Sequence, residues 1–323
     1  MTDRRNIIDG HCHVSSTYCV PNEFFLGLAQ NLHCRYSALR KSLPLNRILD
    51  LVVTQHQDHF ADEFIDELDG AGIEQAVLLV PDFTFVMKSE ATIAELAVRH
   101  FEIMQRHPGR FFVLFGVDPR WGKDGLDLFE RSLADYGFHG LKIYPPCGYS
   151  ASDSSLYPYY EICRERNIPV LIHTGPTVPT LSFQHGHPNE VEQAARDFPE
   201  VSFILAHGGV NYVHEAALLC AYRPNVYLDI GGFLSALHPQ GWVEHLRDLF
   251  RLGINHKVIF GTDWPVFKMQ GGQKKVVNDL LRASGPFSET GDIERNLIMS
   301  GNILRLLSAA KERAPHSSRS LVA

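Results

Sequence analysis

The chain has 323 residues, a formal net charge of −7, 45% hydrophobic residues and 21% charged residues. This composition is typical of a globular protein, and the acidic balance argues against a nucleic-acid surface, because it offers no basic stripe to phosphate groups. No apolar run reaches the roughly 20 residues of a membrane-spanning helix, and no apolar signal core follows the two N-terminal arginines, so we expect a cytoplasmic protein without a membrane partner.

Eight apolar runs of strand length follow one another along the chain. Most are continuously apolar, as expected for parallel strands buried on both faces, and helical patterns separate most of them. The runs are residues 6–14, 73–80, 110–119, 138–146, 168–175, 201–209, 225–232 and 257–265. This alternation predicts an α/β fold, a single (β/α)8 TIM barrel over residues 1–307. A doubly wound sheet is the alternative, but no glycine-rich fingerprint follows the first run.

The first connection, residues 15–72, is too long for an ordinary loop between a strand and a helix. Its segments 24–43 and 60–72 have helical patterns, which predict a helical cap over the barrel mouth. His56 and His59 fall on this cap, and we expect both on its surface. At the other end of the chain, residues 308–323 are predicted to be a disordered tail.

Ionisable side chains stand near the C-terminal ends of five of the eight runs, where a buried strand should carry none without a function or a partner. In a barrel these ends converge on one mouth. The residues are His11, His13, Lys142, His173, His207 and Asp263. His11 and His13 are two apart on a strand, so they point the same way and can share an ion. Imidazole and carboxylate together suit Zn²⁺ or a neighbouring divalent metal.

A second histidine pair with the same spacing, His185 and His187, follows a proline-containing loop rather than a strand. For that reason we do not assign it to the site.

The blocks that carry these residues resemble the amidohydrolase superfamily, in particular the amidohydrolase-related (amidohydrolase 2) branch of metal-dependent TIM-barrel hydrolases and decarboxylases. The resemblance covers nearly the whole chain. Its motifs are DGHCHV (9–14), GLKIYPP (140–146), PVLIHTG (169–175), ILAHGG (204–209), FGTDWP (260–265) and NLIMSGNILRLL (296–307). The order and spacing of these blocks are specific for the superfamily, but they do not identify the reaction.

The resemblance implies that His11, His13, His173 and Asp263 bind a divalent metal, foremost one Zn²⁺, with Mn²⁺ or a second ion as alternatives. It also implies two catalytic residues. Asp263 is the candidate base for metal-activated water. His207 either binds a second metal or is the candidate for polarising the substrate or transferring a proton. The partner is a small-molecule substrate, and the resemblance makes a homodimer plausible.

Lys142 allows two interpretations. Some superfamily members carboxylate a lysine at this position and use it to bridge two metals, whereas an unmodified lysine would bind substrate or neighbouring carboxylates; we favour a single metal. Tyr144, Trp264 and Phe267 follow positions that face the mouth, so they are candidates for the substrate pocket. Packing at the top of the barrel is the alternative for these aromatic residues.

Two reactions suit such a site. The first is hydrolysis of a small amide, lactam or lactone, and the second is non-oxidative decarboxylation of a small aromatic or unsaturated carboxylic acid. Decarboxylases that this branch contains generally have no lysine at the position of Lys142, and some replace the first histidine of the HxH pair with glutamate. Because this chain has both Lys142 and His11, the sequence favours the hydrolase and keeps the lyase as the alternative.

Overall fold

The computed structural model describes residues 6–41, 43–233, 241–268 and 271–312. Eight parallel strands form one sheet in which each strand pairs with the next along the chain. They are β1 (Ile8–Cys12), β2 (Gln75–Val80), β3 (Phe111–Phe115), β4 (Gly140–Ile143), β5 (Val170–His173), β6 (Phe203–Ala206), β7 (Val226–Asp229) and β8 (Val258–Ile259). Each predicted run contains one of these strands, so the predicted strand order is confirmed.

Hydrogen bonds between β1 and the segment after β8 close the sheet into a barrel. The amide of Gly10 donates to the carbonyl of Phe260 at 2.8 Å, and the amide of Asp263 donates to the carbonyl of His11 at 2.8 Å. The amide of His13 donates to the carbonyl of Trp264 at 2.7 Å. The TIM-barrel prediction is therefore confirmed, and the closure brings the first and last predicted metal ligands side by side.

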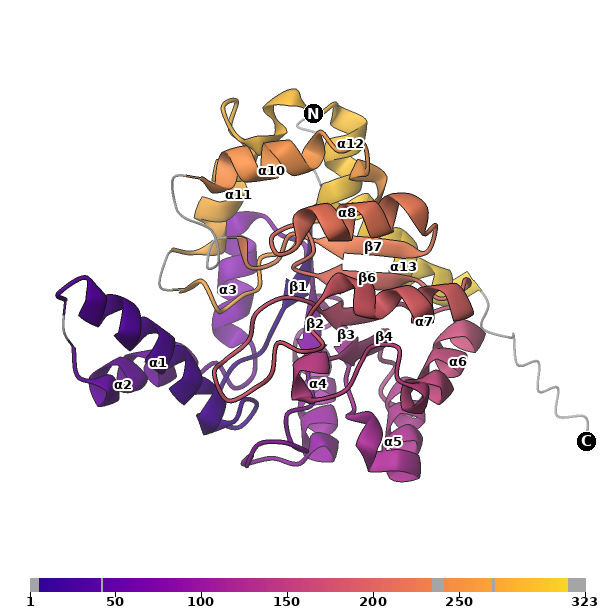
Figure 1. Cartoon of the computed structure of the whole chain (residues 1–323), viewed down its shortest axis with the longest axis horizontal. Helices are drawn as coiled ribbons and strands as arrows, with labels where there is room; N and C mark the ends of the chain where they lie inside the picture. Colours follow the sequence, from indigo (N-terminus) through magenta and orange to yellow (C-terminus); the bar gives the residue numbers. More distant parts are fainter. Residues whose placement is uncertain (1–5, 42, 234–240, 269–270, 313–323) are drawn as a thin grey trace, which may run out of the picture.

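Helices surround this barrel, as Figure 1 shows. Those that follow β2 to β8 are α4 (Ile93–Arg106), α5 (Gly122–Asp135), α6 (Tyr157–Arg166), α7 (Glu192–Asp197), α8 (Val213–Tyr222), α10 (Trp242–Phe250), α11 (Gln273–Leu281), α12 (Asp292–Asn296) and α13 (Asn302–Glu312). None of the helices that the structure describes is long and apolar enough to cross a membrane.

Three helices are inserted after β1, as the length of that connection predicts: α1 (Asn22–Ala38), α2 (Leu45–Gln55) and α3 (Asp62–Ala71). Helices α1 and α2 form a hairpin at one side of the barrel (Figure 1), with an apolar cluster of its own made by Phe25, Ala29, Ile48 and Val52. Helix α1 lies against the loop after β5 at Gly27, where an added Cβ would stand 2.6 Å from the Cβ of Val178. Only a glycine permits this approach.

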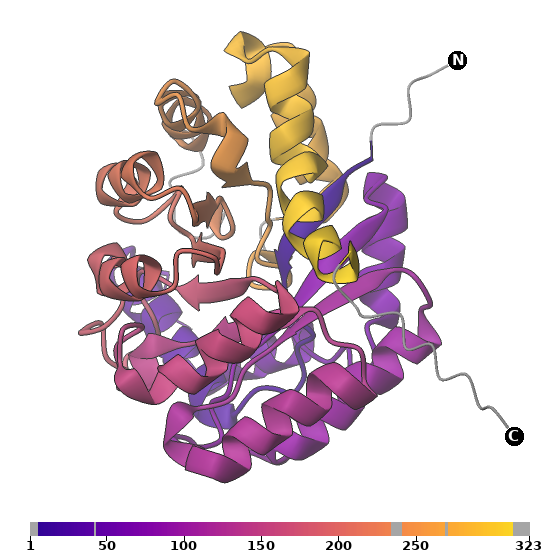
Figure 2. The ribbon, with the colours of Figure 1, turned by 90° about the vertical axis from the view of Figure 1, so that its right-hand side faces the viewer.

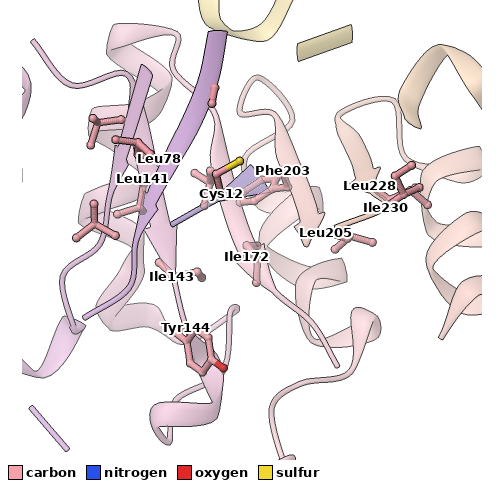
Figure 3. Close-up of a cluster of buried hydrophobic side chains, with 14 of the residues drawn as sticks. Cys12, Leu78, Leu141, Ile143, Tyr144, Ile172, Phe203, Leu205, Leu228 and Ile230 are labelled. Atoms are coloured by element: carbon pink, nitrogen blue, oxygen red, sulfur yellow. The ribbon is translucent and has the colours of Figure 1, made fainter. Parts of the chain in front are cut away.

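The barrel interior is filled by side chains that alternate along the strands, among them Ile8, Val77, Leu114 and Ile204. Apolar residues of α13, which lies beside β1 in Figure 2, complete this cluster. Side chains of the opposite alternation form a second layer between strands and helices. Figure 3 shows part of that layer, with Leu78, Ile172, Leu205 and Cys12 among its members. The packed interior confines any ligand to the ends of the barrel.

The last helix, α13, continues to Glu312, five residues beyond the predicted end of the barrel. The remainder of the predicted tail, residues 313–323, lies outside the described residues.

Candidate metal centre and active site

Two imidazole nitrogens and one carboxylate oxygen converge where β1 and β8 end. His11 Nε2 and His13 Nε2 each lie 3.4 Å from Asp263 Oδ1. The other ring nitrogens already have acceptors, since His11 Nδ1 lies 2.8 Å from Asp229 Oδ2 and His13 Nδ1 lies 2.9 Å from the carbonyl oxygen of Leu79. Because both Nδ1 atoms donate, a neutral imidazole at either position directs the lone pair of its Nε2 towards the carboxylate.

This arrangement fits a divalent cation. Lone pairs that converge in a buried place repel one another unless a proton or a cation lies among them. His11 Nε2 is buried and has no hydrogen-bond partner within the described chain. Burial would raise the pKa of Asp263, but His13, His207 and His11 outweigh it and hold that pKa at about 2, so the carboxylate is ionised. Imidazole and carboxylate are the donors that Zn²⁺ and Mn²⁺ accept.

Asp229, at the end of β7, orients two of the histidines. One of its oxygens accepts the Nδ1–H of His11, and the other accepts the backbone amides of His207 and Gly231 at 2.8 Å each. Such a carboxylate fixes the tautomer of a metal-binding imidazole and raises its basicity. The Asp229 pKa lies below its usual value even though burial raises it, because His11 and His207 stabilise the charged form.

Asp9 plays a similar part for the segment that carries Asp263. It accepts hydrogen bonds from the amide of Thr262 at 2.9 Å, from the side chain of Gln273 at 2.9 Å and from the amide of His11 at 3.2 Å. Burial raises the pKa of Asp9 to about 6. Sequence analysis missed this role, although an acidic residue inside an apolar strand was the available signal.

His207 follows β6 at the same mouth. Its backbone and that of Asp263 adopt left-handed conformations, with φ of 62° and 64°. Non-glycine residues held this way cost about 1–3 kcal/mol each and gather at functional sites. The Nδ1–H of His207 donates to the carbonyl of Gly231 at 2.8 Å, which leaves Nε2 available to a substrate. Burial, followed by the influence of His11, lowers the His207 pKa, so the resting imidazole is neutral.

His173, a predicted metal ligand, lies at the same mouth but apart from the cluster. Its ring centroid is 5.0 Å from that of His207 and 4.1 Å from that of Tyr144, on which it stacks. Its Nε2 lies 3.1 Å from the carbonyl oxygen of Pro176. Among the described residues, the sets of donor atoms within 4.8 Å of one another are His11–His13–Asp263 and His11–His207–Asp229. The role of His173 as a ligand therefore stays a prediction.

Lys142 is buried on β4 close to the same cluster. Burial lowers its pKa to about 8, and the carboxylates of Asp229 and Asp263 oppose that shift. In the part of the chain that the structure describes, no carboxylate lies within the 4.0 Å of an ion pair with Lys142. The carboxylates of Asp229 and Asp263 therefore act on Lys142 through space, without an ion pair.

A cavity of about 350 Å³ opens onto this cluster, within the range of small-molecule sites. His13, His173, His207 and Asp263 lie at its inner end, and Phe24, Phe25 and Leu28 of α1 line its outer part. The inserted hairpin therefore contributes directly to the cavity. His56, expected on the surface of the cap, is instead buried and lines the cavity, so that expectation was wrong.

One wall of the cavity is a continuous series of aromatic contacts. Phe24 and Phe83 have ring centroids 4.9 Å apart, Phe83 and Tyr144 are also 4.9 Å apart, and Tyr144 stacks on His173. Tyr144 therefore lines the cavity, and its part in binding a substrate stays a prediction.

Trp264 and Phe267, the other aromatic residues predicted for the pocket, do not line this cavity. Trp264 stacks on Phe64 of α3 at 5.8 Å and contacts Phe267 at 5.5 Å, and both are buried. The Trp264 side chain turns towards the inserted helix α3, which lies against α11, and Phe267 packs on Trp264, so both pack the barrel top.

Comparison with known proteins places this site in context. The family model described as amidohydrolase matches residues 8–308. Over 101 residues the chain is 28% identical to the protein fluG of Emericella nidulans, a match that covers 31% of this chain and 12% of that protein. Over 235 residues it is 23% identical to 2-amino-3-carboxymuconate-6-semialdehyde decarboxylase of Dictyostelium discoideum. That match covers 64% of this chain and 63% of the relative, so the chain spans less than two thirds of either curated protein.

Solved structures share the fold. The 5-carboxyvanillate decarboxylase LigW from Sphingomonas paucimobilis is 15% identical with a TM-score of 0.61, over 94% of this chain and 99% of that one. A dihydroxybenzoic acid decarboxylase from Polaromonas sp. JS666, solved with manganese and the inhibitor 2-nitroresorcinol, is 16% identical with a TM-score of 0.60. The latter match covers 95% of this chain and 98% of the other. At these sequence identities, the likeness to the two structures shows a shared fold alone.

Proposed function

The chain belongs to the amidohydrolase family, and we propose that within it this protein is a metal-dependent enzyme that removes carbon dioxide, without oxidation, from a small aromatic or unsaturated carboxylic acid. The observation that carries this proposal is the cavity, whose largely apolar and aromatic walls end on the cluster of His13, His207 and Asp263. Decarboxylases among the relatives and the similar structures support it and shift the balance away from the hydrolase that the sequence favoured.

An apolar cavity favours this chemistry for a physical reason. A carboxylate placed among apolar side chains loses hydration, whereas the carbon dioxide that leaves is uncharged and needs none. Aliphatic and aromatic side chains such as Val80, Phe83, Tyr144 and Val266 surround the path to the cluster. They also keep bulk water from the carbon at which charge develops when the bond breaks.

His11, His13 and Asp263 would hold the ion, and we propose His173 as a fourth ligand. When bound, a divalent ion supplies positive charge that attracts the carboxylate and withdraws electrons from the substrate. Zinc was the expectation from sequence, and manganese in the Polaromonas structure makes Mn²⁺ an equal candidate. Metal analysis of the purified protein distinguishes them, and loss of metal from a His173→Ala variant checks the fourth ligand.

His207 is the proposed proton donor. When the carbon–carbon bond breaks, its electron pair remains on the substrate carbon, which then takes up one proton as carbon dioxide departs. In the resting enzyme the proton of His207 lies on Nδ1, which donates to the carbonyl of Gly231, so Nε2 first takes up a proton from water and then delivers it to the substrate carbon. The lowered pKa of His207 makes its protonated form a stronger acid than an ordinary histidine, so the proton is given up readily.

Hydrolysis of a small amide, lactam or lactone is the second candidate, and Lys142 is the observation that favours it. A buried cation close to Asp229 and Asp263 would help to stabilise an oxyanion. Decarboxylation gives this lysine no evident task, so its replacement separates the two reactions.

The test of the proposal is carbon dioxide release from a panel of benzoate and unsaturated acids, run with the metal-loaded enzyme in deuterated water. We expect one equivalent of carbon dioxide per product and one deuterium at the carbon that lost the carboxyl group. A His207→Asn variant should lower the rate by about 10²–10⁴-fold, as removal of a general acid does, while the metal content stays unchanged. Hydrolysis of amides or lactones without carbon dioxide release would support the second candidate instead.

A further inference from the structure

The outer part of the cavity has no cationic side chain among the described residues. None of the lysines or arginines that the structure describes lines it. The segments 234–240 and 269–270, which the structure does not describe, contain no lysine or arginine in their sequences. Lys268 lines only a neighbouring space of about 10 Å³ and pairs with Glu63 at 2.6 Å. Among the residues that the structure describes, a second anionic group on a ligand in the outer part would therefore have no ion-pair partner.

The two histidines of the outer part add no positive charge. His56 Nδ1 lies 2.6 Å from the carbonyl oxygen of Val52, and His100 Nδ1 lies 2.8 Å from that of Leu96. Each Nδ1–H donates to that carbonyl, so a neutral ring leaves Nε2 as an acceptor, which repels a carboxylate. Burial lowers the pKa of both residues, that of His100 to about 4, and this keeps them uncharged near neutral pH.

The remaining surroundings are uncharged and mostly apolar, with Asn31 of α1 as a polar side chain in the lining. Phe24 and Leu28 of α1 are half-buried and Phe25 is buried, and all three line the cavity opposite the strand ends. The aromatic wall continues from Phe24 through Phe83 to Tyr144 without a charged group. Burying apolar ligand surface here would contribute about 25 cal/mol per Å².

From these observations we infer that the enzyme is selective for monoanionic acids: the single carboxylate lies at the histidine–aspartate end, and an uncharged apolar body extends to Phe24, Phe25 and Leu28. This inference rests on the proposed function, because it takes the reacting carboxylate to lie at the inner end. According to this inference, the residues of α1 select substrates by their charge. An acid with a second carboxylate at the far end is excluded, since burying that charge unpaired is costly.

The test compares two ligands of similar length, 4-butylbenzoate and 4-(2-carboxyethyl)benzoate, whose far ends are apolar and anionic respectively. Their affinities for the metal-loaded enzyme are measured by calorimetry, which does not depend on turnover. We expect 4-butylbenzoate to bind at least about tenfold tighter, corresponding to about 1.4 kcal/mol. Equal binding, or tighter binding of the dianion, would overturn the inference.

Substitution of Leu28 assigns the effect to α1. Leu28→Arg places a cation in the outer part, and because Leu28 is half-buried the guanidinium can reach water. We expect this variant to reverse the order of the two ligands, whereas Leu51→Arg, on the exposed side of α2, should leave it unchanged. Unaltered preference in a folded, metal-loaded Leu28→Arg variant would contradict the role of α1, and the wild-type comparison stands even if that variant does not fold.

The outcomes also separate this inference from the proposed function. A preference for the monoanion without carbon dioxide release from any acid would retain the inference and reject decarboxylation. Carbon dioxide release together with equal binding of both ligands would support decarboxylation and reject the inference.

Discussion

The inner and outer ends of the cavity are built from different parts of the chain and held with different precision. At the inner end, side chains project from strand ends, and backbone carbonyls and Asp229 fix their imidazoles at hydrogen-bond distance. At the outer end, the inserted helix α1 contributes Phe24, Phe25 and Leu28, and two of these are only half-buried. We infer from this difference that the two ends have separate functions. Under the proposed function, the inner residues bind the metal and carry out the reaction, whereas the outer residues select the substrate, so we expect that they can change without loss of the metal.

The largest effect is expected at the inner end. His13→Ala removes one of three converging donor atoms, so metal affinity and turnover should both fall by at least about 10²-fold. Loss of a residue that only hydrogen-bonds to a metal ligand costs up to about 10²-fold, and loss of a ligand itself should cost at least as much. Metal content measured by mass spectrometry and initial rates check this. The control is His185→Ala, taken from the second histidine pair, whose ring contacts Glu190 instead. Full metal occupancy in His13→Ala would remove that residue from the ligand set.

Asp229→Asn tests how far orientation alone matters. The amide preserves the shape of the side chain but removes the charge that holds the Nδ1–H of His11. Metal affinity should fall by about 10–100-fold while 4-butylbenzoate keeps its preference over the dianion, because the outer end is untouched. Competition with a chelator of known affinity measures the metal affinity of this variant and of the wild type. Unchanged affinity would show that Asp229 does not act through His11.

Lys142→Met distinguishes the two reactions that are proposed for the inner end of the cavity. If decarboxylation is the activity, turnover should remain within about tenfold of the wild type, since the lysine delivers no proton and binds no described ligand residue. Loss of one oxyanion-stabilising group would instead cost about 10²–10³-fold in a hydrolase. Parallel assays of carbon dioxide release and of ester or amide hydrolysis decide between the two results.

The smallest effect is expected at the outer end. In Gly27→Ala the new methyl group would stand 2.6 Å from the Cβ of Val178, so α1 must shift away from the barrel. We expect affinity for 4-butylbenzoate to fall severalfold and stability to fall by about 1–3 kcal/mol, with metal content unchanged. The control is Gly70→Ala on α3, where an added Cβ meets nothing within 4 Å and helix propensity should make the change neutral or stabilising. Loss of metal in Gly27→Ala would mean that the two ends are coupled.

The barrel could be predicted from sequence because parallel strands buried on both faces appear as continuous apolar runs, such as 73–80 and 168–175. The histidines at strand ends could be predicted for the same reason, since ionisable groups are rare there. The orientation of a residue in the cap could not. His56 stands in a polar stretch of sequence, but the packing of α2 against α1 buries it against Phe25, at a ring distance of 5.4 Å. Likewise, Trp264 turns towards α3 because the insertion provides Phe64 as a stacking partner.

The most direct test of the division between the two ends is a crystal structure of the metal-loaded enzyme with 4-butylbenzoate. We predict one ion among His11, His13 and Asp263 at about 2.0–2.2 Å from its ligands, with the carboxylate at that end beside His207. The butyl chain should lie against Phe24 and Leu28. A ligand bound in the opposite direction, with its carboxylate towards α1, or an ion held elsewhere would contradict the account.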